Sequence, residues 1–243
     1  MNIVIDQGNT FAKVGVFENN ELIDSKSGLS DKELIDFVSS MNVKAICISS
    51  VSKQEIELVS LFADYCKTIL VLNSSTDLPI QKRYETPQTL GNDRIAAAIG
   101  AKYIFPHHDC LVIDMGTCIT YDLIDKDQNF EGGIISPGLR MRFKALNSFT
   151  KRLPLIESPN PSQDLIGKST EKAMQSGVMN GILAEMSGFI NQYQEIYPKC
   201  KVLLCGGDAQ YFERRLKIPI FVSSSLVLIG LNHILNYYLK QKA

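Results

Sequence analysis

The sequence predicts an α/β protein made of two similar halves with one cleft between them. Short β-like runs alternate with helical runs along most of the 243 residues, which is the pattern of α/β folds. An apolar strand that ends in Asp-x-Gly also occurs twice, at 3–10 and at 111–118. Because the two copies lie about half a chain length apart, each is expected to open one half, 1–107 and 108–243. Two such halves would form one ligand cleft.

The composition indicates a folded globular protein and excludes several functional classes. Hydrophobic residues make up 45% of the chain and the formal net charge is -1, so disorder is not expected. The near-neutral charge argues against a nucleic-acid binder that depends on phosphate neutralisation. No apolar run is long enough to cross a membrane, and the N-terminus lacks a signal-peptide pattern. We therefore expect a cytoplasmic protein that binds neither nucleic acid nor membrane.

The 6 cysteines and 3 histidines do not have the spacing of metal ligands. No two cysteines form a Cys-x-x-Cys pair, and several lie inside apolar strands, so buried and reduced thiols are expected. His107 and His108 follow Pro106 in an expected loop, and His233 falls on an apolar helix. A zinc site is therefore not expected.

The first half reads as strands and helices in alternation. Ser30 and Glu33 have the spacing of a capping box, and the apolar residues that follow predict a helix there. A further helix is expected near 53–65, and an alanine-rich helix opens at Gly91 or Asn92 after a loop around 73–88. The expected strands are 2–6, 12–17, 21–26, 44–49 and 68–72.

The second half continues the alternation after its own Asp-x-Gly turn. Its most loop-like stretch is 153–162, which is rich in Pro, Ser and Asn. The expected strands are 110–115, 118–124, 129–135, 201–205 and 219–222. The expected helices are 169–196, a shorter one near 208–216 and a last one from 224.

Each Asp-x-Gly turn has features that suit the phosphates of a nucleotide triphosphate. The aspartate lies where a buried strand ends, and the glycine lets the backbone turn tightly and approach a ligand. Asn9, Thr10 and Thr117 can donate N–H and O–H groups to phosphate oxygens, while the aspartates can hold a cation and its water shell. Lys13, on the adjoining strand, is either a solvated lysine or a countercharge for phosphate. One such turn is typical of an ordinary hairpin, but two in register with a half-chain repeat favour nucleotide binding.

A second candidate element, Gly91 to Arg94, opens the alanine-rich helix. Asn92 or Asp93 would be explained by helix capping alone, since polar and acidic residues favour a helix N-terminus. Arg94 needs another reason, because a positive charge there opposes the helix dipole and indicates an anionic partner. An acid beside a base at a triphosphate site fits an alcohol kinase, in which Asp93 accepts the hydroxyl proton and Arg94 holds an anionic group.

Two familiar nucleotide-binding motifs are excluded. Gly167-Lys168-Ser169 resembles the end of a Walker A loop, but the first glycine of that motif would fall at Ser162, and no buried strand precedes it. No Gly-x-Gly-x-x-Gly occurs anywhere in the chain, so a Rossmann dinucleotide site has no support.

Six short motifs carry a family resemblance through their order and spacing. They are residues 6–13, 91–94, 114–117, 132–138, Thr170 with Ala173 and Gly177, and 206–209. With them the sequence resembles the type III pantothenate kinases over nearly its whole length. That family belongs to the fold group of actin, sugar kinases and heat-shock chaperone ATPases, so the resemblance implies two ribonuclease H-like halves.

The resemblance implies transfer of the ATP γ-phosphoryl group to pantothenate, the first step toward coenzyme A. It implies a divalent cation such as Mg²⁺ with the ATP, and a monovalent cation, K⁺ or NH₄⁺, at Asp114. Asp93 resembles the family's proton acceptor, and Thr170 resembles a substrate contact near the interface of a homodimer. The implied pantothenate contacts are Tyr84, Gly91, Asn92, Asp93, Arg94 and Thr170. The implied ATP contacts are Asp6, Gln7, Gly8, Asn9, Thr10, Phe11, Ala12, Lys13 and Thr117.

The sequence departs from the family pattern at three positions, and two other functions stay open. Cys118 stands where a small Ala is more common, Cys205 stands where Thr is usual, and Asn92 stands where small apolar residues are more common. One alternative function is a kinase of another small hydroxylated metabolite, such as a sugar. The other is a nucleotide-binding regulator without turnover, which the presence of Asp93 and Arg94 argues against.

Overall fold

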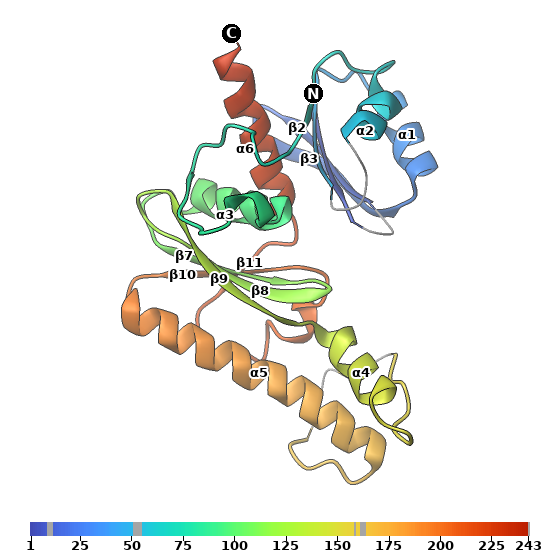
Figure 1. Cartoon of the computed structure of the whole chain (residues 1–243), viewed down its shortest axis with the longest axis vertical. Helices are drawn as coiled ribbons and strands as arrows, with labels where there is room; N and C mark the ends of the chain where they lie inside the picture. The colour runs from blue at the N-terminus through green and yellow to red at the C-terminus, as the bar shows by residue number, and fades with distance from the viewer. Residues whose placement is uncertain (9–11, 51–54, 158, 161–163, 243) are drawn as a thin grey trace. The chain divides into compact units, whose positions relative to one another are not determined.

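The structure, a computed structural model, describes residues 1–8, 12–50, 55–157, 159–160 and 164–242 (Figure 1). The chain divides into two compact units. Unit 1 consists of Met1–His107, Ile124–Gly132 and Ser225–Ala243, and unit 2 consists of His108–Leu123 and Gly133–Ser224. Two segments of the expected C-terminal half therefore pack with the N-terminal residues.

The sheet of unit 1 has a central strand that is apolar on both faces. Ile3, Val4 and Ile5 have no exposed surface, so both sides of this strand are covered. The strand pairs in antiparallel fashion with one neighbour and in parallel with the other. In sheet order the strands are β3 (Glu21–Leu29), β2 (Ala12–Glu18), β1 (Asn2–Gln7), β4 (Ala45–Ser50) and β5 (Ile69–Val71).

The sheet of unit 2 repeats this strand order, which supports the half-chain repeat. Its central strand, β7, likewise has a parallel neighbour, and this neighbour pairs in parallel with a short outer strand. In sheet order the strands are β9 (Asn129–Pro137), β8 (Cys118–Ile124), β7 (Cys110–Met115), β10 (Lys201–Cys205) and β11 (Phe221–Val222). The two-residue strand β6 (Gln81–Lys82) pairs in parallel with Asn129 and Phe130 at the start of β9.

The first helix of unit 1, α1 (Asp31–Ser39), begins at the expected capping box. The Ser30 N–H donates to Glu33 Oε2 at 2.8 Å, and the Glu33 N–H donates back to Ser30 Oγ at 3.5 Å. These bonds satisfy two of the N–H groups that a helix start leaves without partners. The next helix, α2 (Glu55–Phe62), leads to β5.

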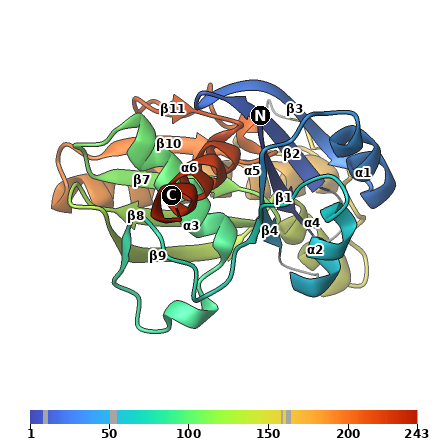
Figure 2. The same cartoon turned by 90° about the horizontal axis from the view of Figure 1, so that it is seen from above.

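Two further helices of unit 1 cross at close range. Both views place α3 (Asn92–Ile104) beside α6 (Leu226–Gln241) (Figures 1 and 2). A Cβ at Gly230 would overlap the Ala96 carbonyl oxygen, and one at Gly100 would overlap the Leu226 carbonyl oxygen. Glycine at these two positions therefore lets the two backbones touch. The short turn η1 (Pro87–Thr89) lies just before α3.

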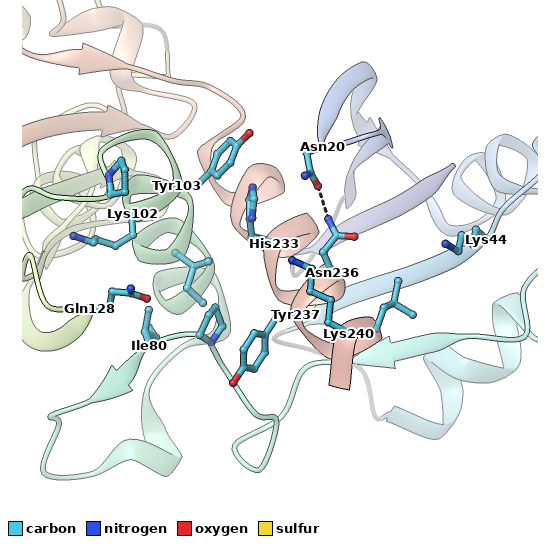
Figure 3. A pocket seen from close by; sticks show the side chains of 14 residues that line it. Asn20, Lys44, Ile80, Lys102, Tyr103, Gln128, His233, Asn236, Tyr237 and Lys240 are labelled. Carbon is cyan, nitrogen blue, oxygen red and sulfur yellow. Dashed lines mark hydrogen bonds between the residues drawn. The ribbon is translucent and has the colours of Figure 1, made fainter. Parts of the chain in front are cut away.

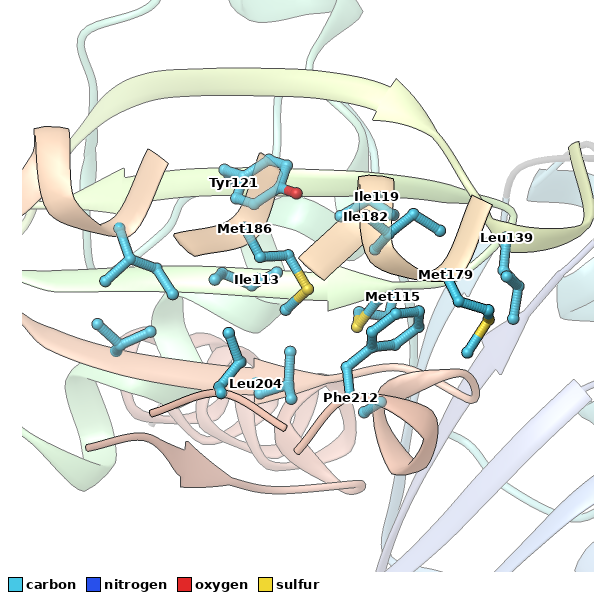
Figure 4. Close-up of a cluster of buried hydrophobic side chains, with 14 of the residues drawn as sticks. Ile113, Met115, Ile119, Tyr121, Leu139, Met179, Ile182, Met186, Leu204 and Phe212 are labelled. Atoms are coloured by element: carbon cyan, nitrogen blue, oxygen red, sulfur yellow. The ribbon is translucent and has the colours of Figure 1, made fainter. Parts of the chain in front are cut away.

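The core of unit 2 lies between its sheet and one long helix, α5 (Thr170–Ile196). Its buried apolar residues recur every three or four positions, so one face of the helix covers the sheet. Figure 4 shows Met179, Ile182 and Met186 of this helix against strand residues such as Ile113 and Leu204. The shorter helix α4 (Leu139–Ser148) precedes it. Among the described residues no helix is both long and apolar enough to span a membrane.

The structure corrects one expected element and adds another. The helix expected near 208–216 is only a single 3₁₀ turn, η2 (Ala209–Tyr211), followed by isolated turns such as the bond from the Leu216 N–H to the Phe212 carbonyl. Helix α4 was not expected, because only Leu139 and Phe143 of its ten residues are buried. The other expected strands and helices are present, with ends that differ by a few residues.

Candidate active site

The Asp-x-Gly turn of unit 1 begins at the end of β1. Asp6 lies directly opposite Lys13 of β2 and beside Ser49 of β4. Directly opposed residues of antiparallel strands share one face of the sheet, so the acid and the base are held together at the edge of the turn. Gln7 is buried and Ala12 pairs with it, which closes the hairpin. Asn9, Thr10 and Phe11, three of the expected ATP contacts, lie outside the described residues.

The start of α3 presents the carboxylate that the sequence indicated as proton acceptor. Gly91 is the N-cap residue, and Asp93 lies in the first turn, half-buried. Asp93 Oδ1 accepts a hydrogen bond from the Arg94 N–H at 2.8 Å, so the carboxylate folds back over the helix start. A Cβ at Gly91 would collide with this same oxygen. Glycine at position 91 therefore leaves room for the orientation of Asp93.

Asn92 fixes the helix start to the sheet. Its side-chain Nδ2 donates to the Leu72 carbonyl, just beyond the end of β5, at 3.0 Å. The bond ties the first residue of α3 to the carboxyl end of a strand, where ligands of α/β sheets commonly bind. Asn92 thus positions Asp93 and Arg94, a task that the sequence did not reveal.

Arg94 is a buried cation held between two aromatic rings of unit 1. Only 8% of the residue is exposed. Its guanidinium carbon lies 5.9 Å from the ring centroid of Tyr84 and 5.8 Å from that of Phe130, within the range of cation–π attraction. The two rings meet edge to face, with centroids 6.1 Å apart. The structure therefore brings Tyr84 and Arg94 together, as expected of two residues that contact one substrate.

The Asp-x-Gly turn of unit 2 is enclosed by close backbone contacts. Asp114 pairs with Cys205 of the parallel strand β10. Gly206, the next residue, has φ +89°, and a Cβ there would lie 2.5 Å from both Asp114 Oδ1 and the Met115 backbone nitrogen. The Asp208 N–H donates to the Met115 carbonyl at 3.0 Å, and the Gly116 N–H donates to the Cys118 carbonyl at 3.1 Å. These contacts hold the turn in one shape.

A cavity of about 270 Å³ opens over this second turn. Backbone groups of Gly116 and Gly207 and the exposed side chain of Thr117 line one part of it, and Arg140 and Asp208 line another. Donors of this kind bind phosphate. Burial raises the pKa of the half-buried Asp208 carboxyl, and the Arg140 guanidinium opposes this shift.

Arg140 and Asp208 had no expected role, and the reason is clear from their positions. Arg140 lies on the unexpected helix α4, and Asp208 follows β10, almost 70 residues later. Asp208 lies in the motif at 206–209, which contributed to the family resemblance, but no role was expected for this residue. The only sequence signal was a nearby glycine in each case: Gly138 two residues before Arg140, and Gly206-Gly207 directly before Asp208.

A polar cluster supports the segment that carries Arg140. Arg142 Nη2 forms an ion pair with Glu185 Oε2 of α5 at 2.7 Å and also donates to Ser136 Oγ at 2.9 Å. The Nε of the same arginine donates to the Pro137 carbonyl at 2.8 Å. Tyr121 Oη donates to the other oxygen of Glu185 at 2.9 Å. Burial and the Glu185 charge raise the pKa of Tyr121, so this hydroxyl stays protonated. The cluster fixes the start of α4 relative to β9.

Thr170 and the cation sites are less defined. Thr170 is the exposed first residue of α5, and it is not among the residues that line the cavity over the unit 2 turn. Within the described part of the chain, no group of three or more His, Cys, Asp or Glu side chains has the arrangement of a metal site. The described carboxylates at or beside the turns are those of Asp6, Asp114 and Asp208, and none of them belongs to such a group.

Comparison with known proteins decides the family. A family model described as type III pantothenate kinase matches residues 2–192. The chain belongs to the type III pantothenate kinase family. A type III pantothenate kinase of Cytophaga hutchinsonii is 47% identical over 237 residues, covering 98% of this chain and 99% of the relative. One of Phocaeicola vulgatus is 42% identical over 245 residues, covering 98% of each.

A solved structure confirms the fold expected for a type III pantothenate kinase. A candidate 2-dehydro-3-deoxygalactonokinase from Sinorhizobium meliloti superposes with a TM-score of 0.64 and covers 98% of this chain and 99% of its own. At 13% sequence identity this likeness concerns the fold alone. The expected sugar-kinase-like architecture of two α/β units is thereby confirmed for this type III pantothenate kinase.

Proposed function

We propose that this chain transfers the γ-phosphoryl group of ATP to the primary hydroxyl of pantothenate, giving 4'-phosphopantothenate and ADP. The observation that supports this most strongly is the start of α3, where Asp93 stands next to the buried cation Arg94. Family membership supplies the substrate, and these two side chains supply the chemistry that the substrate needs. Because the reaction consumes ATP, we place the enzyme in the cytoplasm.

Unit 1 binds the acceptor in this proposal. Pantothenate carries one carboxylate and a primary hydroxyl. Arg94, with little water around it, attracts the carboxylate strongly, and its planar guanidinium can bind both oxygens. Tyr84 covers the guanidinium and contacts the acceptor beside it, and Gly91 and Asn92 set the helix start that aims Asp93.

Asp93 removes the proton of the attacking hydroxyl. As the hydroxyl oxygen forms its bond to the γ-phosphorus, the bond from that phosphorus to the bridging oxygen breaks, and ADP leaves with the electron pair. The proton passes to the Asp93 carboxylate. Since the transition state of phosphoryl transfer is loose, alignment and charge neutralisation give most of the acceleration, and proton removal adds to it.

We infer that each of the two turns can bind phosphate. In unit 2, Gly207, the Thr117 hydroxyl and the Arg140 guanidinium are the proposed phosphate donors among the residues that line one cavity. In unit 1, Lys13 stands opposite Asp6 and offers a countercharge, with Gln7, Gly8 and Ala12 forming the strand ends around the turn. The expected contacts Asn9, Thr10 and Phe11 complete the proposed site.

Two cations fit the carboxylates at the turns. Mg²⁺ binds proteins through one or two carboxylates and keeps several waters when it accompanies a nucleotide. Asp6 in unit 1 and Asp208 in unit 2 are each suited to hold a divalent cation through its water shell, and Asp114 would ligate the monovalent one. When bound, these cations neutralise phosphate charge.

We also propose a homodimer through the outer face of α5. Gly177, Gly181 and Gly188 lie on this helix, and a Cβ at any of them would meet nothing within 4 Å. Nearby, Leu165 and Ile166 are 81% and 75% exposed. Small residues beside exposed apolar ones suit close helix contact with a second copy. Thr170, at the start of the same helix, would approach the substrate at this contact.

Light scattering at micromolar concentration should give the mass of a dimer; a monomer would contradict this part of the proposal.

The activity is tested with purified enzyme, ATP, Mg²⁺ and a panel of acceptors. Phosphate transfer to pantothenate, with little transfer to sugars, is expected, and omission of K⁺ and NH₄⁺ should lower the rate. Turnover of a sugar in preference to pantothenate would support the alternative kinase. Nucleotide binding with no acceptor phosphorylated would support a regulator without turnover.

A further inference from the structure

Unit 1 contains a second cavity, formed by none of the proposed active-site residues. Its volume is about 560 Å³, which lies in the range of sites that bind small organic molecules. The wall consists of the C-terminal parts of α3 and α6, the segment before β6 and the turn before β9 (Figure 3). It is therefore a separate pocket with its own chemistry.

The wall of this pocket is basic. Lys44, Lys102 and Lys240 line it, and no Asp or Glu is among its described lining residues. Lys102 is only 6% exposed, and its ammonium donates to the Lys126 carbonyl at 3.3 Å. Because a buried lysine is rare and its charge is weakly screened, the pocket attracts anions more strongly than a surface of the same charge.

One side of the pocket is flat and aromatic. The ring of Tyr103 stacks on His233, with centroids 3.7 Å apart and planes at 31°, and Tyr237 adds a further ring. Ile80 and Ile99 extend the apolar surface. Such a wall favours a planar or apolar body, and the cations favour a negative group on the same molecule.

His233 supplies a polar atom for which the described residues offer no partner. Its Nε2 is buried and makes no hydrogen bond with any part of the chain that the structure describes. Burial and the nearby Lys240 charge lower the pKa of His233, so its ring is neutral near pH 7. The neutral ring of His233 therefore adds aromatic surface to the pocket rather than a charge.

We propose that this pocket binds a small organic anion that combines one acidic group with an aromatic or apolar body. The acidic group is attracted by the lysines of the wall, and the body lies against the stacked rings of Tyr103 and His233. This site is independent of the two phosphate-binding turns, so it is occupied together with ATP.

The probe for this proposal is 8-anilinonaphthalene-1-sulfonate, an aromatic anion whose fluorescence rises on binding. The full-length enzyme is titrated in the presence of saturating ATP and Mg²⁺, which occupy the nucleotide site. N-phenyl-1-naphthylamine, the same aromatic body without the sulfonate, is the matched neutral probe. The sulfonate should bind, and at least about tenfold more tightly than the neutral probe, as expected for a partly desolvated charge contact.

Two lysines of α6 give a matched pair of variants. Lys240 lines the pocket, whereas Lys242 contacts the ring of Tyr238 and does not line it. Lys240→Met should weaken sulfonate binding about three- to tenfold, and Lys242→Met, with the same change of net charge, should leave it almost unchanged. Lys240 is exposed, so its loss should not affect folding. Lys102→Met should weaken binding further, with circular dichroism as the check on folding.

Three results would overturn the proposal. The first is sulfonate binding that occurs without ATP but is lost with saturating ATP. The second is equal weakening of sulfonate binding by Lys240→Met and Lys242→Met. The third is binding of both probes with the same affinity. The first would place the anion at the nucleotide site, and the other two would show that charge in this pocket does not select the ligand.

Discussion

The turns after β1 and β7 occupy the same place in two sheets of the same strand order, yet their surroundings differ. In unit 1, Asp6 faces Lys13 across a hairpin, and the chain leads on to a helix whose start carries Asp93 and Arg94. In unit 2, Gly206 approaches Asp114 directly, and Arg140 and Asp208 complete a cavity over the turn.

The difference shows which part of each unit specialises. The strand order places each turn, and the segments between the strands determine what can bind near it. Between β3 and β4 the chain forms one helix, α1. Between β9 and β10 its described residues form two, α4 and α5, and α4 brings Arg140 to the cavity. We therefore propose that Arg94 of unit 1 binds the acceptor and that Arg140 of unit 2 binds phosphate, in addition to the phosphate-binding turn of unit 1.

The largest effect is expected at Asp93. Asp93→Asn removes the proton acceptor but keeps the side-chain shape, so kcat should fall about 10²- to 10⁴-fold. ATP affinity should stay nearly the same, because the nucleotide phosphates bind elsewhere. Steady-state kinetics and nucleotide titration measure the two effects, with the exposed Asp127→Asn as control. Unchanged turnover would remove Asp93 from the mechanism.

The next effect tests the closed turn of unit 2. Gly206→Ala forces a side chain into a positive φ and against Asp114 and Met115, so it should lower stability by about 1–3 kcal/mol and weaken ATP binding. Gly207→Ala is the matched control for stability, because a Cβ there meets no protein atom within 4 Å. Thermal unfolding and nucleotide titration compare them. Equal Tm values and equal ATP affinities for the two variants would show that the turn tolerates a side chain at position 206.

The support of α4 should give a smaller effect. Glu185→Gln keeps the shape of the side chain but weakens its ion pair with Arg142, so KM for ATP should rise about threefold. KM for pantothenate should not change, which separates positioning from a general loss of structure. Glu195→Gln, on an exposed part of the same helix, is the control. A parallel rise of both KM values would argue against the proposed role.

The smallest effect is a pH dependence of stability at Asp208. Burial raises its folded-state pKa above the usual 3.8, so the acid stabilises the fold when protonated and loses that contribution as pH rises through the folded pKa. Asn at this position does not titrate. The Tm of Asp208→Asn should therefore exceed that of the parent at pH 7, and the difference should shrink toward pH 4. A Tm difference between the two proteins that does not change with pH would contradict the raised pKa of Asp208.

The sequence predicted the repeated frame better than the site inside it. Asp6 and Asp114 stand at equal places in apolar strands, and this local pattern was sufficient to predict two similar sheets. Arg140 could not be predicted as a cavity residue, because charged residues interrupt the weak apolar period of α4. The expected helix near 208–216 failed because contacts far along the chain fix that segment, such as the Asp208 N–H bond to the Met115 carbonyl.

The proposed roles of Arg94 at the acceptor and Arg140 at the nucleotide are tested most directly by a pair of arginine variants. Arg94→Lys loses the planar contact with Tyr84 and the two-oxygen contact with a carboxylate, so KM for pantothenate should rise about tenfold or more. Arg140→Lys should instead raise KM for ATP. Measured side by side, each variant should change the KM for one substrate and leave the other within about twofold. A change in both KM values for both variants, or a reversed pattern, would contradict the division between acceptor and nucleotide sites.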